Sequence, residues 1–256
     1  MTARYIAILS GKGGVGKTTT TINLAVALAQ LNHRVVVVDT NLVTPNVSLH
    51  LGLPPTPTNL NAVLKNQAKI HEAVTYHESG IHVIPAGLSV LESANNITVD
   101  FKDALAPLSD KYDFVLLDCA AGLWGQIAKA VKAADDVLIV TNPELPALVD
   151  ALKSIKMAEK LGINVKGVIL NKSSGESHEV KQETIDGILN GTRILTRIPF
   201  DKNVLKSASR RKPIVYAKPY SPAARAYKKF AAEMAGVHYK ESVADIIIGA
   251  MASIAS

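Results

Sequence analysis

Eight consecutive residues near the start of the chain have the types and spacing of a phosphate-binding loop. They run from Gly11 to Thr18 and read G-K-G-G-V-G-K-T. Glycines let the backbone curl so that successive N–H groups face one anion. In such loops the last two residues are a lysine, here Lys17, that reaches the β- and γ-phosphates of a nucleotide, and a hydroxyl residue, here Thr18, that binds Mg²⁺. The residues expected to contact the nucleotide here are Gly11, Gly13, Gly14, Val15, Gly16, Lys17, Thr18 and Thr19.

Two regular elements are expected on either side of this loop. The apolar run Tyr5–Leu9 predicts a strand, and apolar residues at helical spacing predict a helix over Thr19–Leu31. The helix would point the positive end of its dipole at the phosphates. A glycine-rich turn that binds nothing is the alternative, and a full match in a strand–loop–helix setting argues against it.

The remaining sequence alternates between buried strands and helices. Near-continuous apolar runs are typical of strands buried on both faces of a mostly parallel sheet. We therefore predict an α/β fold, a single doubly wound domain over residues 1–236 with seven or eight strands and ligands at their carboxyl ends. The clearest helices are Leu145–Leu161 and Ser221–Ala235. The runs predicted as strands are Val35–Val38, Ile81–Ile84, Phe114–Leu117, Val137–Val140, Val165–Leu170 and Ile194–Ile198.

Asp118 follows the apolar run Phe114–Leu117 directly. A carboxylate at the tip of such a strand holds Mg²⁺ in phosphoryl-transfer proteins, which makes Asp118 a metal candidate together with Thr18. The alternative is that Asp118 caps a helix.

Composition narrows the class of protein. A single cysteine, Cys119, excludes a disulfide framework and a Cys-x-x-Cys metal site. Neither a secretory signal nor a membrane-spanning run is recognised, so the cytoplasm is the expected compartment. The net charge is +6, and 11 of the 28 Lys and Arg residues lie between Arg193 and Lys229, with Asp201 as the one acid. An anionic partner, DNA or a lipid surface, would fit this basic region, and so would simple solubility.

A second lysine in the loop, Lys12, narrows the class further. The run K-G-G-x-G-K-T resembles the deviant phosphate loop of the MinD/ParA family of ATPases, and the resemblance extends over residues 4–236. It implies ATP and Mg²⁺ as ligands, and a homodimer that forms on ATP binding. It also implies that Lys12 reaches across the dimer to the partner's phosphates. The alternative is a solvated loop lysine.

The resemblance also assigns roles to Asp39 and Asn41. In the family the loop after the second strand reads D-x-D, where the first Asp lies near Mg²⁺ and the second orients the attacking water. Asp39 matches the first position, but Asn41 replaces the second. An amide can orient water but cannot accept its proton, so we expect slow ATP hydrolysis. A plain turn role for Asn41 is the alternative. The loop after Asp118 lacks the family's proline, since Ala120 stands there.

For the base, the resemblance points to Asn171 and to the loop Pro199, Phe200 and Asp201. The asparagine would bond adenine and the loop would line the other side of the ring. Asparagines also cap strands commonly, so a role without nucleotide remains open for Asn171.

Residues 237–256 form a separate tail. Val243, Ile246, Ile247, Ala250, Met251 and Ile254 would share one face of a helix. MinD-like members of the family carry a membrane-targeting amphipathic helix at this place. By resemblance, such a helix would hold the protein peripherally on the inner face of the membrane. Beyond Tyr239 and Lys240 the tail has no aromatic, Lys or Arg residue, so packing on the domain, on another subunit or on a protein partner is the alternative.

The expected function is a slow, ATP-dimerising ATPase of the MinD type that regulates the position of cell division or of a cellular structure. It would work with an activating or cargo protein. Two alternatives remain: a ParA-like partition ATPase whose ATP dimer binds DNA nonspecifically, and a hydrolysis-poor scaffold switched by ATP.

Overall fold

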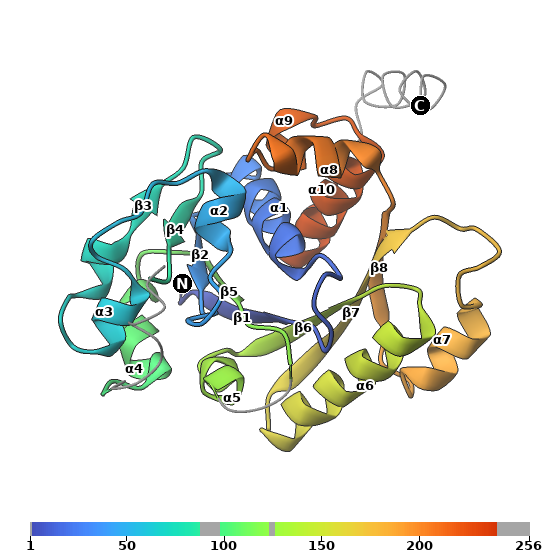
Figure 1. The fold of residues 1–256 in the computed structure, drawn as a ribbon, viewed down its shortest axis with the longest axis horizontal. Coiled ribbons are helices and arrows are strands. Elements are labelled where there is room, and N and C mark those ends of the chain that lie inside the picture. Colours follow the sequence, from blue (N-terminus) through green and yellow to red (C-terminus); the bar gives the residue numbers. More distant parts are fainter. Residues whose placement is uncertain (1, 88–97, 123–125, 240–256) are drawn as a thin grey trace.

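The computed structural model describes residues 2–87, 98–122 and 126–239, and these form one α/β domain built on an eight-stranded sheet (Figure 1). The strand order is β3-β4-β2-β5-β1-β6-β7-β8. The strands are β1 (Arg4–Leu9), β2 (Val35–Asp39), β3 (Thr75–Tyr76), β4 (His82–Ile84), β5 (Phe114–Asp118), β6 (Asp136–Thr141), β7 (Asn164–Ser173) and β8 (Ile194–Pro199).

All neighbouring strands pair in parallel except β3, which is antiparallel to β4 at one edge. The parallel register brings the carboxyl ends of the central strands together. Asp118 lies opposite Ile8 of β1 on one side and Asp39 of β2 on the other. The two acidic residues therefore end adjacent strands beside the loop that leaves β1.

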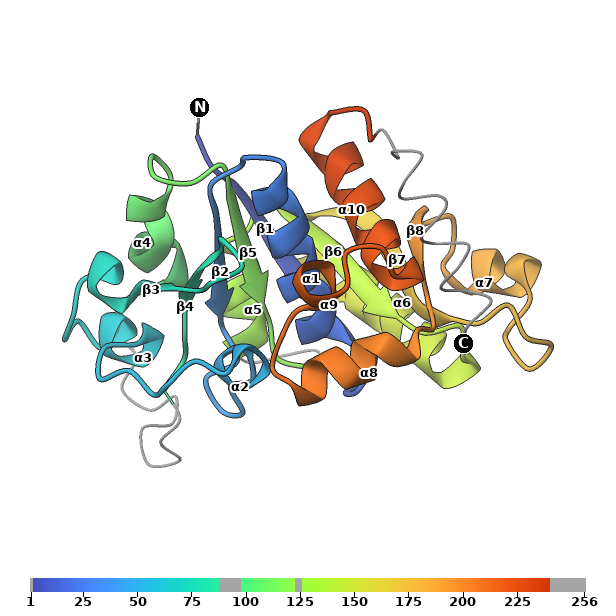
Figure 2. The same cartoon turned by 90° about the horizontal axis from the view of Figure 1, so that it is seen from above.

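Helices cover both faces of the sheet (Figure 2). The face of α1 also carries α2, α9 and α10, and the opposite face carries α3, α4, α5, α6 and α7. The α-helices are α1 (Lys17–Gln30), α2 (Val47–Leu51), α3 (Leu60–Leu64), α4 (Phe101–Leu105), α5 (Gln126–Val131), α6 (Leu145–Lys160), α7 (Gln182–Ile188), α8 (Lys202–Ser209), α9 (Ile214–Ala217) and α10 (Pro222–Ala235).

Alternation along the buried strands explains these two layers. In β1, Ile6 and Ile8 pack into the apolar cluster under α1 and α10, while Ala7 and Leu9 pack into the cluster on the other face. Successive side chains of a strand point to opposite faces, so a run that is apolar at every position requires cover on both. The sheet is buried for that reason.

The predicted fold class is confirmed, and element bounds shift by one to three residues. Asp39 and Asp118 belong to their strands, so Asp118 is not a helix cap. Helix α1 starts at Lys17, two residues earlier than predicted, because Gly16 serves as its N-cap. The edge strand β3 was not predicted, since a two-residue run is too short to show a period.

Helix α10 begins as its sequence suggests and ends where the predicted domain ends. Ser221 is the N-cap and accepts from the N–H of Ala224, and Gly236 closes the helix with φ 69°. The amphipathic helix predicted within residues 237–256 lies outside the described residues from 240 onward. In the three described ranges, no helix combines the length and apolar composition that crossing a bilayer requires.

Candidate functional site

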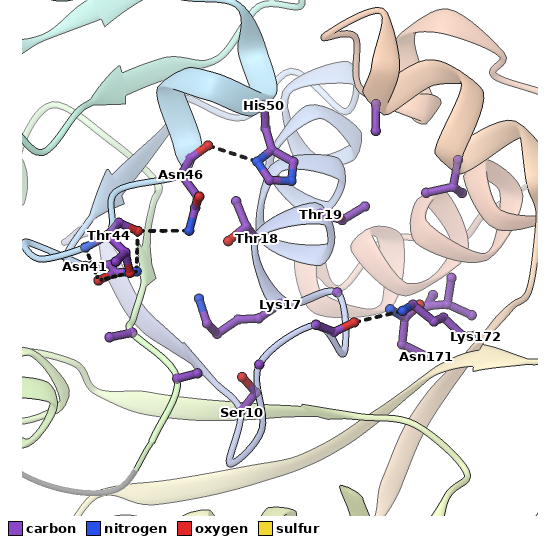
Figure 3. A pocket seen from close by; sticks show the side chains of 18 of the residues that line it. Ser10, Lys17, Thr18, Thr19, Asn41, Thr44, Asn46, His50, Asn171 and Lys172 are labelled. Atoms are coloured by element: carbon purple, nitrogen blue, oxygen red, sulfur yellow. Dashed lines mark hydrogen bonds between the residues drawn. The ribbon is translucent and has the colours of Figure 1, made fainter. Parts of the chain in front are cut away.

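The loop between β1 and α1 leaves its backbone donors available. Gly14 and Gly16 have φ values of 80° and 93°, conformations that L side chains rarely adopt. Gly16 caps α1 and has no side chain that could accept from the first N–H groups of the helix, and Gly16–Thr19 line a cavity of about 890 Å³. A helix N-terminus in this state attracts anions through its free N–H groups and its dipole. Figure 3 shows Lys17, Thr18 and Thr19 around that opening.

Gly11 is required for a different reason. A Cβ at this position would lie 2.2 Å from the backbone oxygen of Asp150 in α6, whereas a Cβ on Gly13 would meet nothing within 4 Å. Gly11 thus allows the loop to pack on α6, while Gly13 lies open to the cavity.

Asp118 organises the start of α1. Its Oδ1 accepts from Lys17 Nζ at 2.8 Å and from the Thr21 hydroxyl at 3.1 Å, and its Oδ2 accepts from the Thr18 hydroxyl at 2.7 Å. Both members of the ion pair are buried, with side chains 9% and 1% exposed. The predicted grouping of Lys17, Thr18 and Asp118 is therefore present in the folded chain.

Asp39 lies in the same buried cluster and is bonded only to backbone. Its Oδ1 accepts from the N–H of Asn41 at 3.1 Å, and its Oδ2 accepts from those of Asn46 and Val47 at 2.9 and 3.0 Å. Burial, followed by the nearby charge of Asp118, raises the pKa of Asp39 to about 7 despite these three bonds. The carboxylates of Asp39 and Asp118 repel each other when both are charged, and a cation bound between them would offset this unfavourable electrostatic energy.

These groups fit Mg²⁺ only in combination with a phosphate. The Thr18 hydroxyl and the Asp39 and Asp118 carboxylates are hard oxygen donors. Among the described residues, no group of three or more acidic, histidine or cysteine side chains could hold a metal ion by itself. Mg²⁺ commonly binds through one or two carboxylates plus phosphate oxygens and water, and this set has that composition.

The side chain of Asn41 is occupied by its own loop. Its Nδ2 donates to the Thr44 carbonyl at 2.6 Å and lies 3.0 Å from the Thr44 hydroxyl, while its Oδ1 accepts from the Thr44 N–H at 3.1 Å. Asn41 lines the cavity, but this closed turn engages both ends of the amide. The arrangement matches the turn role that the sequence left open.

Lys12 is placed apart from the other loop residues. Its side chain is 47% exposed, its Nζ lies 3.7 Å from Glu144 at the start of α6, and it does not line the cavity. The ammonium group is thus outside the phosphate site of its own chain.

Asn171 and Lys172 bind the loop from β7. Asn171 Nδ2 donates to the Val15 carbonyl at 2.7 Å, and Lys172 Nζ donates to the Gly14 carbonyl at 2.8 Å (Figure 3). Asn171 lies within β7, which continues to Ser173, and it faces the cavity. A Cβ on Gly16 would lie 2.2 Å from Asn171 Nδ2, so any side chain at this position would displace the Asn171 amide.

The segment Pro199–Asp201, predicted to line the adenine ring, lines the cavity together with Asn171. Phe200 is 50% exposed, and Asp201 is buried because it caps α8 and accepts from the N–H of Asn203 at 2.8 Å. The carboxylate of Asp201 therefore has a structural partner.

Several lining residues were missed by the sequence analysis. They come from elements without a recognisable motif. Ser10, at the end of β1, has a buried hydroxyl without a hydrogen-bond partner among the described residues, and its place before Gly11 could have identified it. Others face the cavity only through tertiary packing, and they include His50, Val204, Leu205, Ala208 and Tyr227.

Cys119 is a packing residue. It is fully buried, and burial raises the pKa of its thiol to about 12. The thiol is therefore protonated at neutral pH and is a poor nucleophile or metal ligand.

Comparison with known proteins gives a consistent assignment. A ParA family model, described as NUBPL iron-transfer P-loop NTPase, matches residues 1–235. An uncharacterized ATP-binding protein of Methanocaldococcus jannaschii is 37% identical over 92% of this chain and 89% of that protein. The septum site-determining protein MinD of Synechocystis is 31% identical over 91% of this chain and 90% of that protein.

The solved structure of MinD from Pyrococcus horikoshii with Mg-ADP superposes with a TM-score of 0.85. The two chains are 32% identical, and the match covers 91% of this chain and 96% of that one. Together with the geometry of the loop, these matches show that the chain belongs to the MinD/ParA family of P-loop NTPases.

Proposed function

We propose that this chain binds Mg²⁺-ATP at the cavity, dimerises when it is loaded, and hydrolyses ATP slowly as a MinD-type spatial regulator. The observation that carries the proposal is the N-terminus of α1, which has no side-chain cap and where Lys17 and Thr18 both bond to Asp118 beside the cavity. The phosphate oxygens would accept hydrogen bonds from the first N–H groups of α1 and from Lys17, and the base would lie toward Asn171 and Phe200.

Mg²⁺ would be held by the Thr18 hydroxyl with support from Asp118 and Asp39, and its chemistry would be charge neutralisation on the phosphates. The residues of this chain supply the rest. Lys17 adds a cation at the β- and γ-phosphates, and the loop backbone fixes the triphosphate in place.

Dimerisation is supported by the position of Lys12. Its ammonium group lies outside its own cavity, half exposed, and its contact is the surface ion pair with Glu144. An exposed pair of this kind is worth about 0–1 kcal/mol, so Lys12 can leave it at little cost for a partner's phosphates.

Light scattering of the wild type, Lys12→Ala and Glu144→Gln with ATP and with ADP tests this step. We expect dimers with ATP for the wild type and Glu144→Gln, and monomers for Lys12→Ala. If Lys12→Ala dimerises as readily as the wild type, the cross-subunit role is wrong.

Slow turnover is supported by Asn41. An amide that is bonded at both ends to Thr44 is not available to orient water. In Asn41→Asp, one carboxylate oxygen can still accept from the Thr44 N–H, but the other cannot donate to the Thr44 carbonyl and is repelled by it. That second oxygen would be free to turn toward the cavity and accept a proton. We expect phosphate release to rise by about 10²-fold or more, within the range of general-base assistance. An unchanged rate would show that water is aligned elsewhere.

A DNA-binding alternative is favoured by one observation. Exposed basic residues follow one another along α8 and the turn after it, and they are Lys202, Lys206, Arg210, Arg211 and Lys212. Co-sedimentation with anionic liposomes, run beside a gel shift on arbitrary duplex DNA, separates the two functions. Deleting residues 240–256 should abolish only liposome binding, and DNA binding through the basic residues should fall steeply with salt.

A further inference from the structure

His50 is a histidine in the cavity to which the proposed phosphate and base contacts give no role. It lies in α2, and its ring lies over the first turn of α1, close to Thr18 and Thr19 (Figure 3). It lines the main cavity together with those threonines, and it also lines a narrow side cavity with Thr19, Val204 and Ala208. His50 therefore lies where residues of α1 and α8 line the same narrow cavity.

The hydrogen bond of the ring fixes which nitrogen can accept. His50 Nδ1 lies 2.9 Å from the carbonyl oxygen of Asn46. A carbonyl oxygen only accepts, so Nδ1 must carry the hydrogen. In the neutral imidazole the other nitrogen, Nε2, is then an acceptor. Figure 3 places that nitrogen on the side of the ring that faces Thr19.

A nucleotide bound as proposed would pass its sugar through this region. The phosphates lie at Gly16–Thr18 and the base lies toward Phe200, so the sugar must span the stretch between them, beside Thr19. The α8 side chains that face this stretch, Val204, Leu205 and Ala208, are apolar and offer no hydrogen bond. A sugar hydroxyl placed there is a donor, and Nε2 is an acceptor on the opposite wall.

We propose that His50 Nε2 accepts a hydrogen bond from a ribose hydroxyl and so selects ribonucleotides over deoxynucleotides. The inference rests on the proposed function, since it requires a nucleotide in the cavity. The same histidine would connect the sugar to Asp39, a proposed Mg²⁺ residue, through Asn46. The carbonyl of Asn46 accepts from His50, and the N–H of Asn46 donates to Asp39 Oδ2 at 2.9 Å.

The test measures affinities for ATP, 2′-deoxy-ATP and 3′-deoxy-ATP by titration calorimetry. The wild type, His50→Phe and His50→Gln are compared with His71→Phe, a matched change at an exposed histidine in the 3₁₀ turn Ile70–Ala73. A neutral hydrogen bond of about 0.5–1.5 kcal/mol corresponds to about 2- to 12-fold in affinity. We expect the wild type and His71→Phe to bind ATP tighter than one deoxy analogue by that factor.

In His50→Phe the preference should vanish, and His50→Gln, whose amide can still accept, should retain part of it. The analogue that the wild type binds weakly identifies the hydroxyl. Equal wild-type affinity for all three nucleotides, or a preference that survives in His50→Phe, overturns the role of His50 and leaves the proposed function standing. A wild type that binds none of them overturns the proposed function itself.

Discussion

At the phosphate end of the cavity (Gly11–Thr18, Asp39 and Asp118), Lys17 and Asp118 are buried and bonded at 2.8 Å. At the base end (Asn171, residues 199–201 and α8), Phe200 and Leu205 leave 50% and 63% of their surfaces exposed. The phosphate end is thus organised before any ligand arrives. The base end presents apolar side chains that would lose contact with water when a base covers them. The contrast indicates that substitutions at the buried phosphate end affect folding and binding together, whereas those at the exposed side chains of the base end, such as Phe200 and Leu205, affect binding alone.

The largest effect is expected at Lys17. Lys17→Met leaves the buried Asp118 carboxylate beside Asp39 without its cation, and breaking a buried pair in this way costs about 3–5 kcal/mol. We expect the Tm of the ligand-free protein to fall by about 6–20 °C. ATP affinity should be lost as well.

Lys172→Met is the matched control, because it removes an exposed lysine that bonds the same loop at the Gly14 carbonyl. Its Tm should stay within a few degrees of the wild type, and Lys17→Met/Asp118→Asn should recover most of the loss. A Lys17→Met protein as stable as the wild type would contradict a pre-organised phosphate end.

Alanine substitutions at Gly11 and Gly13 distinguish a packing role from a ligand-binding role within the phosphate end. Gly11→Ala places a methyl group 2.2 Å from the Asp150 backbone oxygen, so α6 or the loop must shift, and we expect a loss of about 1–3 kcal/mol. In Gly13→Ala the added methyl group would meet nothing within 4 Å, so the free energy of unfolding should stay within about 0.5 kcal/mol of the wild-type value. Urea denaturation of the ligand-free variants measures both. Equal stability of the two variants would refute the packing role of Gly11.

The pH dependence of stability sharpens the comparison at Asp39. Its pKa is raised from 3.8 to about 7 in the folded chain, so the folded state holds a proton that the unfolded state has lost. The stability from this group is fully present below pH 4, and it is lost as the pH rises through 4 to about 7.

Thermal unfolding of the wild type and Asp39→Asn across pH 4 to 8 measures the effect. Between pH 4 and pH 8 the Tm of the wild type should fall by several degrees more than the Tm of Asp39→Asn. A loss of 1 kcal/mol lowers the Tm by about 2–4 °C in a domain of this size. Parallel curves for the two proteins would show that Asp39 ionises normally.

The smallest effect is expected at the base end. Phe200→Ala removes a half-exposed ring, so the Tm should change little, while ATP affinity should weaken by about 2- to 10-fold if the ring packs on adenine. Tyr76→Ala, at an exposed aromatic residue of the edge strand β3, should change neither affinity nor nucleotide preference. If Phe200→Ala lowers the Tm as much as Gly11→Ala does, the two ends of the cavity do not differ in the way described.

Local patterns predicted the phosphate end because its requirements are local. Gly14, Gly16, Lys17 and Thr18 are consecutive or nearly so, and the positive φ angles require glycine wherever this loop forms. Asp118 was predictable because it ends an apolar run, whereas the role of Asp39 was implied by the family resemblance. The two lie together because the carboxyl ends of parallel strands meet at one edge of a sheet. The fold class followed from the same apolar runs.

Contacts that depend on packing between distant segments were not predictable. No spacing rule connects His50 of α2 with Ala208 of α8, and no pattern shows that Asn41 would close a turn on Thr44 instead of facing the cavity with a free amide. The exposed pairing of Lys12 with Glu144 likewise requires α6 to pack beside the loop.

The sequence alone therefore determined the fold class, the strand–loop–helix at its start and the residue types expected to bind phosphate, because turn dihedral angles and the apolar pattern of a strand are set locally along the chain. Only the tertiary structure decided how large the cavity is, which side chains complete its walls, and which polar atoms already have partners. Those properties depend on the distances between helices that are separated by more than 100 residues in sequence, and side-chain packing alone fixes these distances.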